Sequence, residues 1–183
     1  EESPMSELAV QYADYAYWQR QWLEGEVLEE QLNYWMEQLK GMRDVLELPT
    51  YRPRPPIQTY NGSVETFTID QDMTYRINAL GRQQGVSLFM TLYGAFALLL
   101  YRYTGQEDIA IGSPIANRNH KDTESLIGFF VNTLVLRTKL SGCPDFHELL
   151  NRVRTMTLDA YAYQDIPFER LVEVLSPERN MSH

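Results

Sequence analysis

Apolar residues recur every three or four positions over long stretches of this chain, which places them on one face of an α-helix. In the first such stretch the apolar positions include Tyr12, Tyr15 and Trp18, and Gly25 then interrupts the pattern. A glycine at position 41 closes the second stretch in the position typical after a helix. The pattern predicts six helices, over residues 7–24, 27–40, 71–84, 88–103, 145–162 and 165–175.

Three shorter stretches fit β-strands, over residues 63–69, 109–111 and 128–138. Pro114 is expected to end the second strand, and residues 113–126 to form a polar loop. The four prolines of residues 41–62 predict an extended connector. The element order predicts an α/β fold with a mixed sheet flanked by helices. Three strands are few for six helices, so we expect the sheet to be incomplete in this chain.

The stretch Ile127–Arg137 is an apolar strand pattern that contains one amide, one hydroxyl and one cation. Alternation places odd-numbered and even-numbered residues on opposite faces of the strand. Both faces are mostly apolar, which predicts that the strand is buried on both sides. A buried amide without partners costs about 1–3 kcal/mol. Asn132 therefore needs either partners in the core or a functional role, and the pattern leaves both open.

The chain is acidic, with 16 Lys and Arg residues against 25 Asp and Glu residues and a formal net charge of −9. An acidic chain is poorly suited to nucleic acid or an anionic membrane, and the one basic cluster, Arg52–Arg54, lies among prolines. The longest uncharged run, residues 86–101, is short for a membrane span and predicts a buried core helix. The first residues do not resemble a signal peptide. The single cysteine fits a reducing compartment, so we expect a cytoplasmic protein.

Few residues in the sequence suit metal or nucleophilic chemistry. The histidines His120, His147 and His183 have no paired spacing, and the sequence contains no HExxH, GxSxG, P-loop or GxGxxG motif. A metal site is therefore not expected. Cys143 has no basic neighbour in the sequence, so a reactive thiolate is not expected either.

Polar residues where a buried strand ends are better candidates for function. Ser113, Asn117 and Arg118 follow the strand at 109–111, and loops at strand ends often carry function. An ordinary solvated turn explains the same residues equally well. Asp165 and Pro167 have a structural explanation, because Asp165 can cap the next helix and Pro167 suits its first turn.

Four stretches together resemble the C-terminal lobe of a condensation domain from a nonribosomal peptide synthetase, in the chloramphenicol acetyltransferase-like superfamily. They are Tyr12–Trp18, Gly112–Arg118, Ile127–Arg137 and Tyr163–Glu169, in the family's order and at about its spacing. On physical grounds alone the first stretch predicts an aromatic helix face packed on a core. The resemblance covers nearly the whole chain, so we treat residues 1–183 as one partial lobe that includes the proline-rich connector at 41–62.

The resemblance implies a domain of two lobes with a tunnel between them. Donor and acceptor peptidyl carrier proteins bring their substrates into the tunnel on phosphopantetheine arms, and no cofactor is bound by the lobe directly. The implied partners are these carrier proteins, the N-terminal lobe and an adenylation domain in the same polypeptide. The family's HHxxxDG motif belongs to the N-terminal lobe, and this chain has no His-His pair. The resemblance therefore implies that no catalytic residue lies in this chain and that the fragment alone is inactive.

The resemblance also implies roles for particular residues. This lobe would line the tunnel with Ser113, Asn117, Arg118, Asn132 and Thr133. Charge alone suggests that Arg118 or Arg137 pairs with the motif aspartate across the lobes. The structural positions of the motifs are Tyr12, Asp14, Trp18, Arg137, Gln164, Asp165 and Pro167.

Two alternatives remain open on the sequence. The lobe could be a non-catalytic module on which a carrier protein docks. It could also be the matching lobe of an epimerisation or heterocyclisation domain, although the stretches 130–133 and 164–168 resemble condensation domains more closely.

Overall fold

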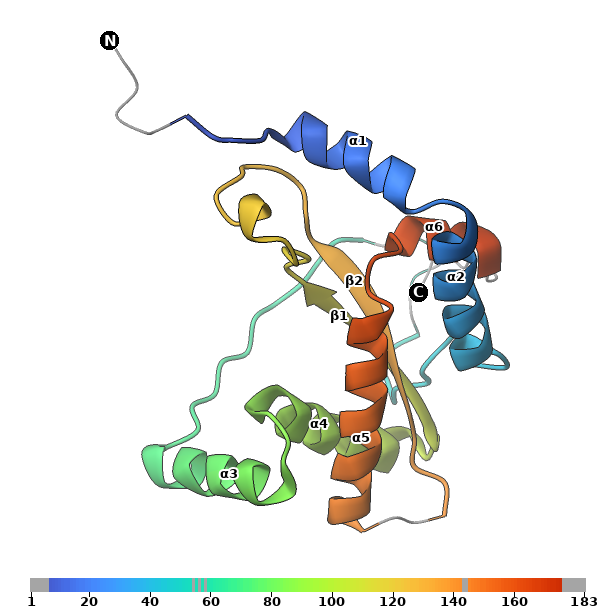
Figure 1. The fold of residues 1–183 in the computed structure, drawn as a ribbon. Coiled ribbons are helices and arrows are strands. Elements are labelled where there is room, and N and C mark those ends of the chain that lie inside the picture. Colours follow the sequence, from blue (N-terminus) through green and yellow to red (C-terminus); the bar gives the residue numbers. More distant parts are fainter. Residues whose placement is uncertain (1–6, 54, 56, 58, 143–144, 176–183) are drawn as a thin grey trace. The chain divides into compact units, whose positions relative to one another are not determined.

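The structure is a computed structural model that describes residues 7–53, 55, 57, 59–142 and 145–175. Cys143, His183 and Arg54 of the basic cluster lie outside these residues. The described elements are α1 Tyr12–Trp22, α2 Gly25–Leu39, α3 Gln71–Gln84, α4 Leu88–Thr104, β1 Asp108–Ile115, a 3₁₀ turn at Lys121–Thr123, β2 Asn132–Lys139, α5 Phe146–Ala162 and α6 Phe168–Leu175 (Figure 1). All six predicted helices are confirmed.

The helix boundaries follow from local capping. Asp70 and Ser87 accept hydrogen bonds from the backbone N–H groups of the third residues of α3 and α4, at 2.8 and 3.2 Å. Gly85 and Gly105 then end these two helices in the left-handed conformation, with φ of 65° and 69°. The first helix begins at Tyr12 rather than at residue 7, because Asp14 accepts a hydrogen bond from the backbone N–H of Gln11 and fixes the start there.

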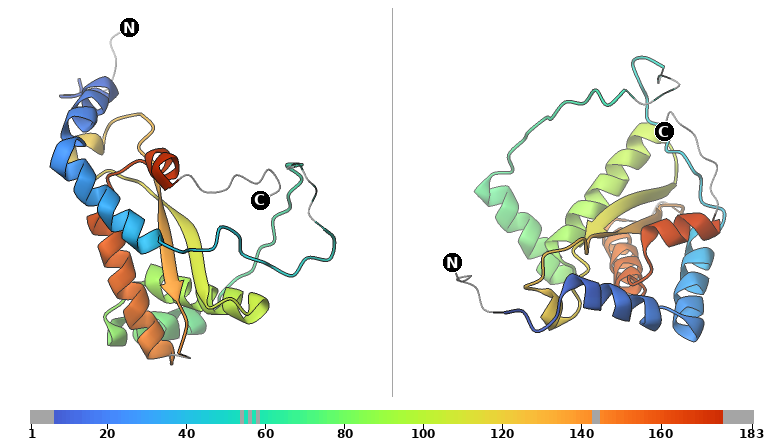
Figure 2. Two further views of the ribbon diagram at one scale, coloured as in Figure 1. Left: turned by 90° about the vertical axis from the view of Figure 1, so that its right-hand side faces the viewer. Right: turned by 90° about the horizontal axis from the view of Figure 1, so that it is seen from above.

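The chain divides into two compact units. Among the described residues, unit 1 consists of those in 7–40, 112–135 and 162–175, and unit 2 of those in 41–111 and 136–161. In unit 1, α2 packs against α6 (Figure 2). In unit 2, α3 packs against α4. The buried apolar side chains of unit 1 are Trp35, Leu39, Leu126, Phe130, Leu134, Ile166 and Leu171.

The described sheet consists of β1 and β2. Arg137 binds Asp108, and Leu140 N–H donates to the carbonyl oxygen of Glu107 at 2.7 Å, so residue numbers rise on one strand as they fall on the other. The pair is therefore antiparallel. With two strands in the described residues, the expected incomplete sheet is confirmed.

Several strand predictions were wrong. Residues 63–69 form no strand, since Val64 and Phe67 are exposed and no described strand pairs with them. Pro114 lies inside β1 rather than ending it, which is tolerated because β1 has one described neighbour and needs no donor on its other edge.

The burial predictions were also too broad. The strand at 128–138 begins at Asn132, and the side chains of Phe129 and Val131 before it are 76% and 52% exposed rather than buried. The helix within the uncharged run is buried on one face only, since Phe96 and Leu99 are 48% and 47% exposed. No single helix among the described residues is long and apolar enough to cross a membrane; α3 and α4 reach the length only together and are bent by 101° between them.

Candidate functional site

Asn132 stands at the start of β2, and its amide is held by four hydrogen bonds to backbone atoms. Its Nδ2 donates to the carbonyl oxygens of Gln164 and Ile166, each at 2.9 Å. Its Oδ1 accepts from the N–H groups of Thr133 at 2.9 Å and Phe168 at 3.0 Å. The residue is 7% exposed. These bonds give the buried amide its partners in the core. Of the two explanations that the sequence left open for Asn132, partners in the core or a functional role, the structure shows the first.

The same amide also explains the start of α6. Phe168 is the first residue of that helix, so its N–H has no partner within the helix. The sequence predicts Asp165 as the cap, but the described bond comes from Asn132 on β2. Pro167 stands directly before the helix, and its carbonyl oxygen accepts from the N–H groups of Arg170 at 3.0 Å and Leu171 at 3.2 Å.

Asp165 links three segments of unit 1. Its Oδ2 accepts from Nε2 of Gln31 on α2 at 3.2 Å, and its Oδ1 from Nδ2 of Asn119 at 3.4 Å. Burial raises the pKa of the nearby Tyr15 phenol above its ordinary value, and the negative charge of Asp165 raises it further. Because Asn132 binds the carbonyls on both sides of Asp165, the amide also fixes where this carboxylate lies.

Arg118 is committed to the loop that contains it. Its guanidinium donates to the carbonyl oxygen of Thr123 and, at 2.9 Å, to that of Leu126. It also lies 4.1 Å from the centroid of the Phe130 ring, within cation–π distance. The described role of Arg118 is therefore to fold residues 118–126 over Phe130.

Helix α1, which carries the aromatic residues, lies beside the same loop (Figure 1). Tyr12 Oη donates to the carbonyl oxygen of Phe129 at 2.9 Å, and the Tyr12 ring meets the Phe130 ring edge to face at 5.2 Å. A Cβ atom on Gly128 would lie 2.2 Å from Cδ2 of Tyr12. Position 128 therefore accepts only glycine without displacing the Tyr12 ring. The aromatic helix face predicted from the sequence packs as expected.

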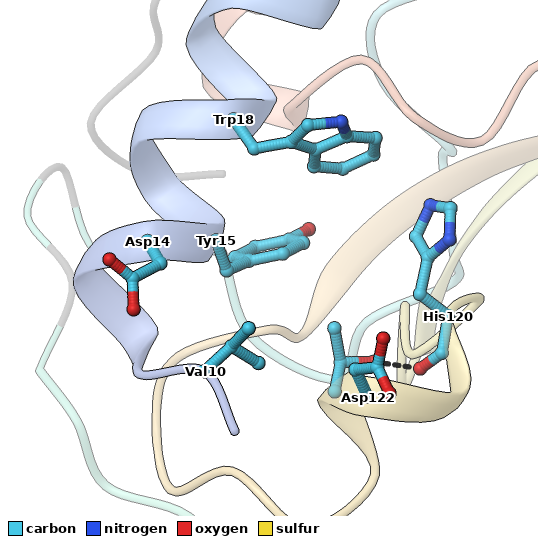
Figure 3. A pocket seen from close by; sticks show the side chains of 7 residues that line it. Val10, Asp14, Tyr15, Trp18, His120 and Asp122 are labelled. Carbon is cyan, nitrogen blue, oxygen red and sulfur yellow. Dashed lines mark hydrogen bonds between the residues drawn. The ribbon is translucent and has the colours of Figure 1, made fainter. Parts of the chain in front are cut away.

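Two hollows in unit 1 border this aromatic face. One has a volume of about 160 Å³ and is lined in part by Asn117, Asn132, Asp165 and Pro167 together with Tyr12. The other, of about 360 Å³, is lined by Val10, Asp14, Tyr15, Trp18, His120, Asp122 and Thr123 (Figure 3).

The structure thus brings part of the expected tunnel lining together. Asn117, which has a left-handed backbone with φ of 51°, shares the smaller hollow with Asn132. Ser113 on β1 and Thr133 on β2 are half-buried and do not line either of these two hollows. Gln164 contributes its carbonyl oxygen to Asn132.

Arg137 belongs to unit 2 and binds a partner on its own sheet. Its Nε and NH2 donate to the two carboxylate oxygens of Asp108 at 2.8 and 2.6 Å. This bidentate hydrogen bond holds the pKa of Asp108 below its ordinary value and that of Arg137 above it. Arg118 and Arg137, which the sequence suggested as partners of a motif aspartate on the other lobe, thus both already bind groups of this chain.

Sequence reasoning missed Gly128, Gln31 and Asp108. A glycine inside an apolar strand pattern signals a close approach, so Gly128 could have been found. Gln31 and Asp108 carry no comparable local signal, because their partners lie 134 and 29 residues away. No group of three or more His, Cys, Asp or Glu side chains that could hold a metal ion is present among the described residues.

A family model described as Condensation domain matches residues 1–183. The chain is 57% identical over 183 residues to a component of the linear gramicidin synthase of Brevibacillus parabrevis, and 50% identical to malpinin synthetase of Mortierella alpina. The two alignments span all of this chain but only 4% and 2% of those relatives.

Solved structures share the fold. The X-domain from teicoplanin biosynthesis, in its complex with OxyB, superposes with a TM-score of 0.90 at 30% identity, covering 98% of this chain and 40% of that one. A four-domain nonribosomal peptide synthetase bound to AMP and glycine superposes with a TM-score of 0.82 at 25% identity, over 86% of this chain and 12% of that one. The match of the family model over the whole chain, together with these relatives, shows that the chain belongs to the condensation-domain family.

Proposed function

We propose that this chain is the C-terminal lobe of a nonribosomal peptide synthetase condensation domain. The observation that carries the proposal is the family match over residues 1–183, with a gramicidin synthase subunit at 57% identity and malpinin synthetase at 50%. In the proposed reaction the amine of an acceptor aminoacyl thioester attacks the carbonyl carbon of a donor thioester. The C–N bond forms, the C–S bond breaks, and the donor's phosphopantetheine thiol leaves with the proton.

The proposed role of the lobe is to form one wall of the substrate tunnel. Proton transfer at the amine needs a general base within hydrogen-bond reach. This chain has three histidines and no His-His pair, so we place that base on the N-terminal lobe. Ile127, Phe129 and Val131 support a contact with that lobe, since these consecutive odd-numbered side chains are 91%, 76% and 52% exposed. A group of large apolar side chains in solvent is typical of a surface that binds another protein segment.

The structure refines the proposed roles of the lining residues. We keep Ser113, Asn117, Arg118, Asn132 and Thr133 as the proposed lining. Because backbone atoms occupy the Asn132 amide, its proposed contribution is to hold the turn at 164–168 beside the tunnel rather than to bind a carbonyl of the substrate. Asn117 is then the lining amide best able to contact a substrate, because its one described hydrogen bond, to Asn119, is 3.5 Å long.

The test is a condensation assay with donor and acceptor carrier proteins loaded with aminoacyl groups. The chain of residues 1–183 is compared with the same segment joined to the N-terminal lobe of its synthetase. We expect dipeptidyl product from the two-lobe protein and none from the lobe alone. Turnover by the lobe alone would contradict the placement of catalysis, and absence of product from the two-lobe protein with several aminoacyl pairs would contradict the proposed function. Chiral analysis of the product separates condensation from epimerisation, and a thiazoline or oxazoline product would indicate heterocyclisation.

A non-catalytic binding module is the second candidate. It is favoured by one observation, that the X-domain with a TM-score of 0.90 is described in a complex with another protein, OxyB. Titration of holo carrier protein onto the lobe, followed by NMR, tests it. Binding by a two-lobe protein that makes no product would favour this candidate over condensation.

The remaining parts of the proposal concern the surroundings of the lobe. We propose carrier proteins and an adenylation domain of the same polypeptide as partners, with substrates held on the carriers' phosphopantetheine. The relatives support this, because they are far longer than this chain and are named as synthases or synthetases. We further propose a cytoplasmic location, which the single cysteine supports.

A further inference from the structure

The larger hollow of unit 1 has the dimensions of a small-ligand site. Its volume of about 360 Å³ lies in the range of about 300–1,000 Å³ that is usual for such sites. Figure 3 shows the Tyr15 and Trp18 side chains extending from α1 toward His120 and Asp122 on the loop opposite. The hollow therefore has an aromatic wall on the helix side and polar groups on the loop side.

The aromatic wall is held in place by ring contacts. Trp18 stacks on Trp22 with centroids 5.4 Å apart and an interplanar angle of 14°, and it meets His120 edge to face at 4.8 Å. Tyr15 lies 5.9 Å from Trp18 on the same face of α1. Such contacts fix the rings before any ligand arrives. The faces of Trp and Tyr attract cations, Trp more strongly than the other aromatic side chains.

The charges around the hollow favour a cation. Asp14 and Asp122 both line it, and the Asp14 carboxylate already accepts a hydrogen bond from the backbone N–H of Gln11. Asp122 has no described hydrogen-bond or ion-pair partner, whereas Arg118, the nearest arginine along the loop, is bound to backbone carbonyls and to Phe130. Lys121, next to Asp122 in the sequence, does not line the hollow. Asp122 is exposed, and its carboxylate offers a counter-charge to a cation in the hollow.

The charge of unit 1 as a whole also favours a cation. Among the described residues, unit 1 contains five Lys and Arg residues against twelve Asp and Glu residues, a formal charge of 5 − 12 = −7. Unit 2 contains nine Lys and Arg residues against ten Asp and Glu residues, a formal charge of 9 − 10 = −1. Most of the net charge of the described residues therefore belongs to the unit that contains the hollow, and its field attracts cations to that unit.

We propose that this hollow binds an organic cation, an ammonium or guanidinium group, against the rings of Tyr15 and Trp18 and the carboxylate of Asp122. The cation is either a free amine or guanidine, or a lysine or arginine side chain of another polypeptide segment. The proposal is independent of the proposed condensation activity, and neither fails with the other.

The test compares choline with 3,3-dimethylbutan-1-ol, which has the same shape without the charge. Each is titrated onto the chain of residues 1–183, and the indole N–H signals of the three tryptophans are followed by NMR. Blocked tripeptides with a central lysine or arginine form a second arm. We expect millimolar binding of the cations and at least tenfold weaker binding of the alcohol. Tripeptides that bind at least tenfold more tightly than choline would identify a polypeptide segment as the source of the cation. Choline that binds at least tenfold more tightly than the tripeptides would identify a free amine.

Matched variants test the location. We expect Trp18→Leu and Asp122→Asn each to weaken cation binding about three- to tenfold. Tyr17→Leu and Glu124→Gln are the controls, since Tyr17 is an exposed aromatic residue of α1 and Glu124 lies two residues from Asp122, but neither lines the hollow. Equal affinity for the alcohol, no binding in either arm, or equal losses in variants and controls would each overturn the proposal. Far-ultraviolet circular dichroism of each variant checks that it is folded.

Discussion

Replacement of Asn132 by alanine is predicted to destabilise unit 1 by more than the loss of a single polar side chain usually does. The change leaves the carbonyl oxygens of Gln164 and Ile166 without their described partner, at about 1 kcal/mol each. It also removes the cap from the Phe168 N–H, which costs about 1 kcal/mol. The sum is about 3 kcal/mol, against a total stability of about 5–15 kcal/mol for a typical domain.

Urea unfolding followed by tryptophan fluorescence is the suitable assay. All three tryptophans lie in unit 1, and Trp35 is 1% exposed with its indole N–H donating to the Tyr163 carbonyl at 2.7 Å. The signal therefore reports this unit. Asn119→Ala is the control, because its two described hydrogen bonds are 3.4 and 3.5 Å long and exposed, and we expect it to cost less than about 0.5 kcal/mol. A loss for Asn132→Ala within about 0.5 kcal/mol of the control would refute the reasoning.

Asn132→Asp separates the two functions of the amide. It keeps an acceptor for the Phe168 N–H but turns a carboxylate oxygen toward two carbonyl oxygens. We expect Asn132→Asp to be at least as destabilising as Asn132→Ala at about pH 7, and partly relieved at low pH, where the protonated carboxyl can donate to one carbonyl. Independence of pH would show that the two carbonyls do not depend on a donor at this position.

Three further predictions concern other contacts. Gly128→Ala should lower the free energy of unfolding by about 1–3 kcal/mol, because the new methyl group would lie 2.2 Å from Cδ2 of Tyr12 and would displace that ring. Thermal unfolding measures the loss. Asp108→Asn should cost about 2–3 kcal/mol by leaving Arg137 with a weaker partner. Because the pKa of Asp108 is lowered in the folded state, the ion pair's contribution to stability is full above the unfolded pKa of 3.8 and is lost as the pH falls through the lower folded value. The stability of Asp108→Asn should therefore fall less in acid than that of the parent. Burial raises the pKa of Tyr93 to about 12, so stability should decline as the pH rises from about 10 to 12 and decline less in Tyr93→Phe, as urea unfolding can show.

The chain offers a control for the glycine prediction. A Cβ atom on Gly112 would meet Thr133 at 3.4 Å, which is ordinary contact. Gly112→Ala should therefore change the thermal midpoint much less than Gly128→Ala. Equal destabilisation of the two variants would contradict the explanation from the contact with Tyr12, because loss of backbone freedom in the unfolded chain stabilises rather than destabilises.

The helices were predictable because their signals are local. The Asp70 and Ser87 caps and the Gly85 and Gly105 stops lie within one turn of the residues they control. The strands were less predictable, since residues 63–69 alternate as a strand should but have no described partner. Strand formation depends on residues distant in the sequence, and an alternating pattern does not record whether they are present.

Two residues that the sequence singled out lie together in the structure, but the sequence did not predict their bonding. Asn132 and Asp165 stood out as polar residues in apolar or turn sequences, and they do lie together. The sequence favoured Asp165 as the cap of α6, the nearest acceptor along the chain. The structure instead has Asn132, 36 residues away, because β2 brings its amide to the helix start. A local rule names the kind of group that a helix start needs, but the fold decides which residue supplies it.

Arg118 binds only carbonyl oxygens in residues 119–126, and it contacts no side chain of that segment in the described interactions. These carbonyl oxygens belong to the backbone, so a substitution that leaves the backbone conformation unchanged still presents them to Arg118. The exposed side chains of Lys121, Asp122, Glu124 and Ser125 could therefore be exchanged for those of a related condensation domain while the loop keeps its path. For domain engineering, this makes the exposed positions of residues 121–125 ones at which sequence can be varied without changing shape, provided that Arg118, Phe130 and the buried Thr123 and Leu126 are retained.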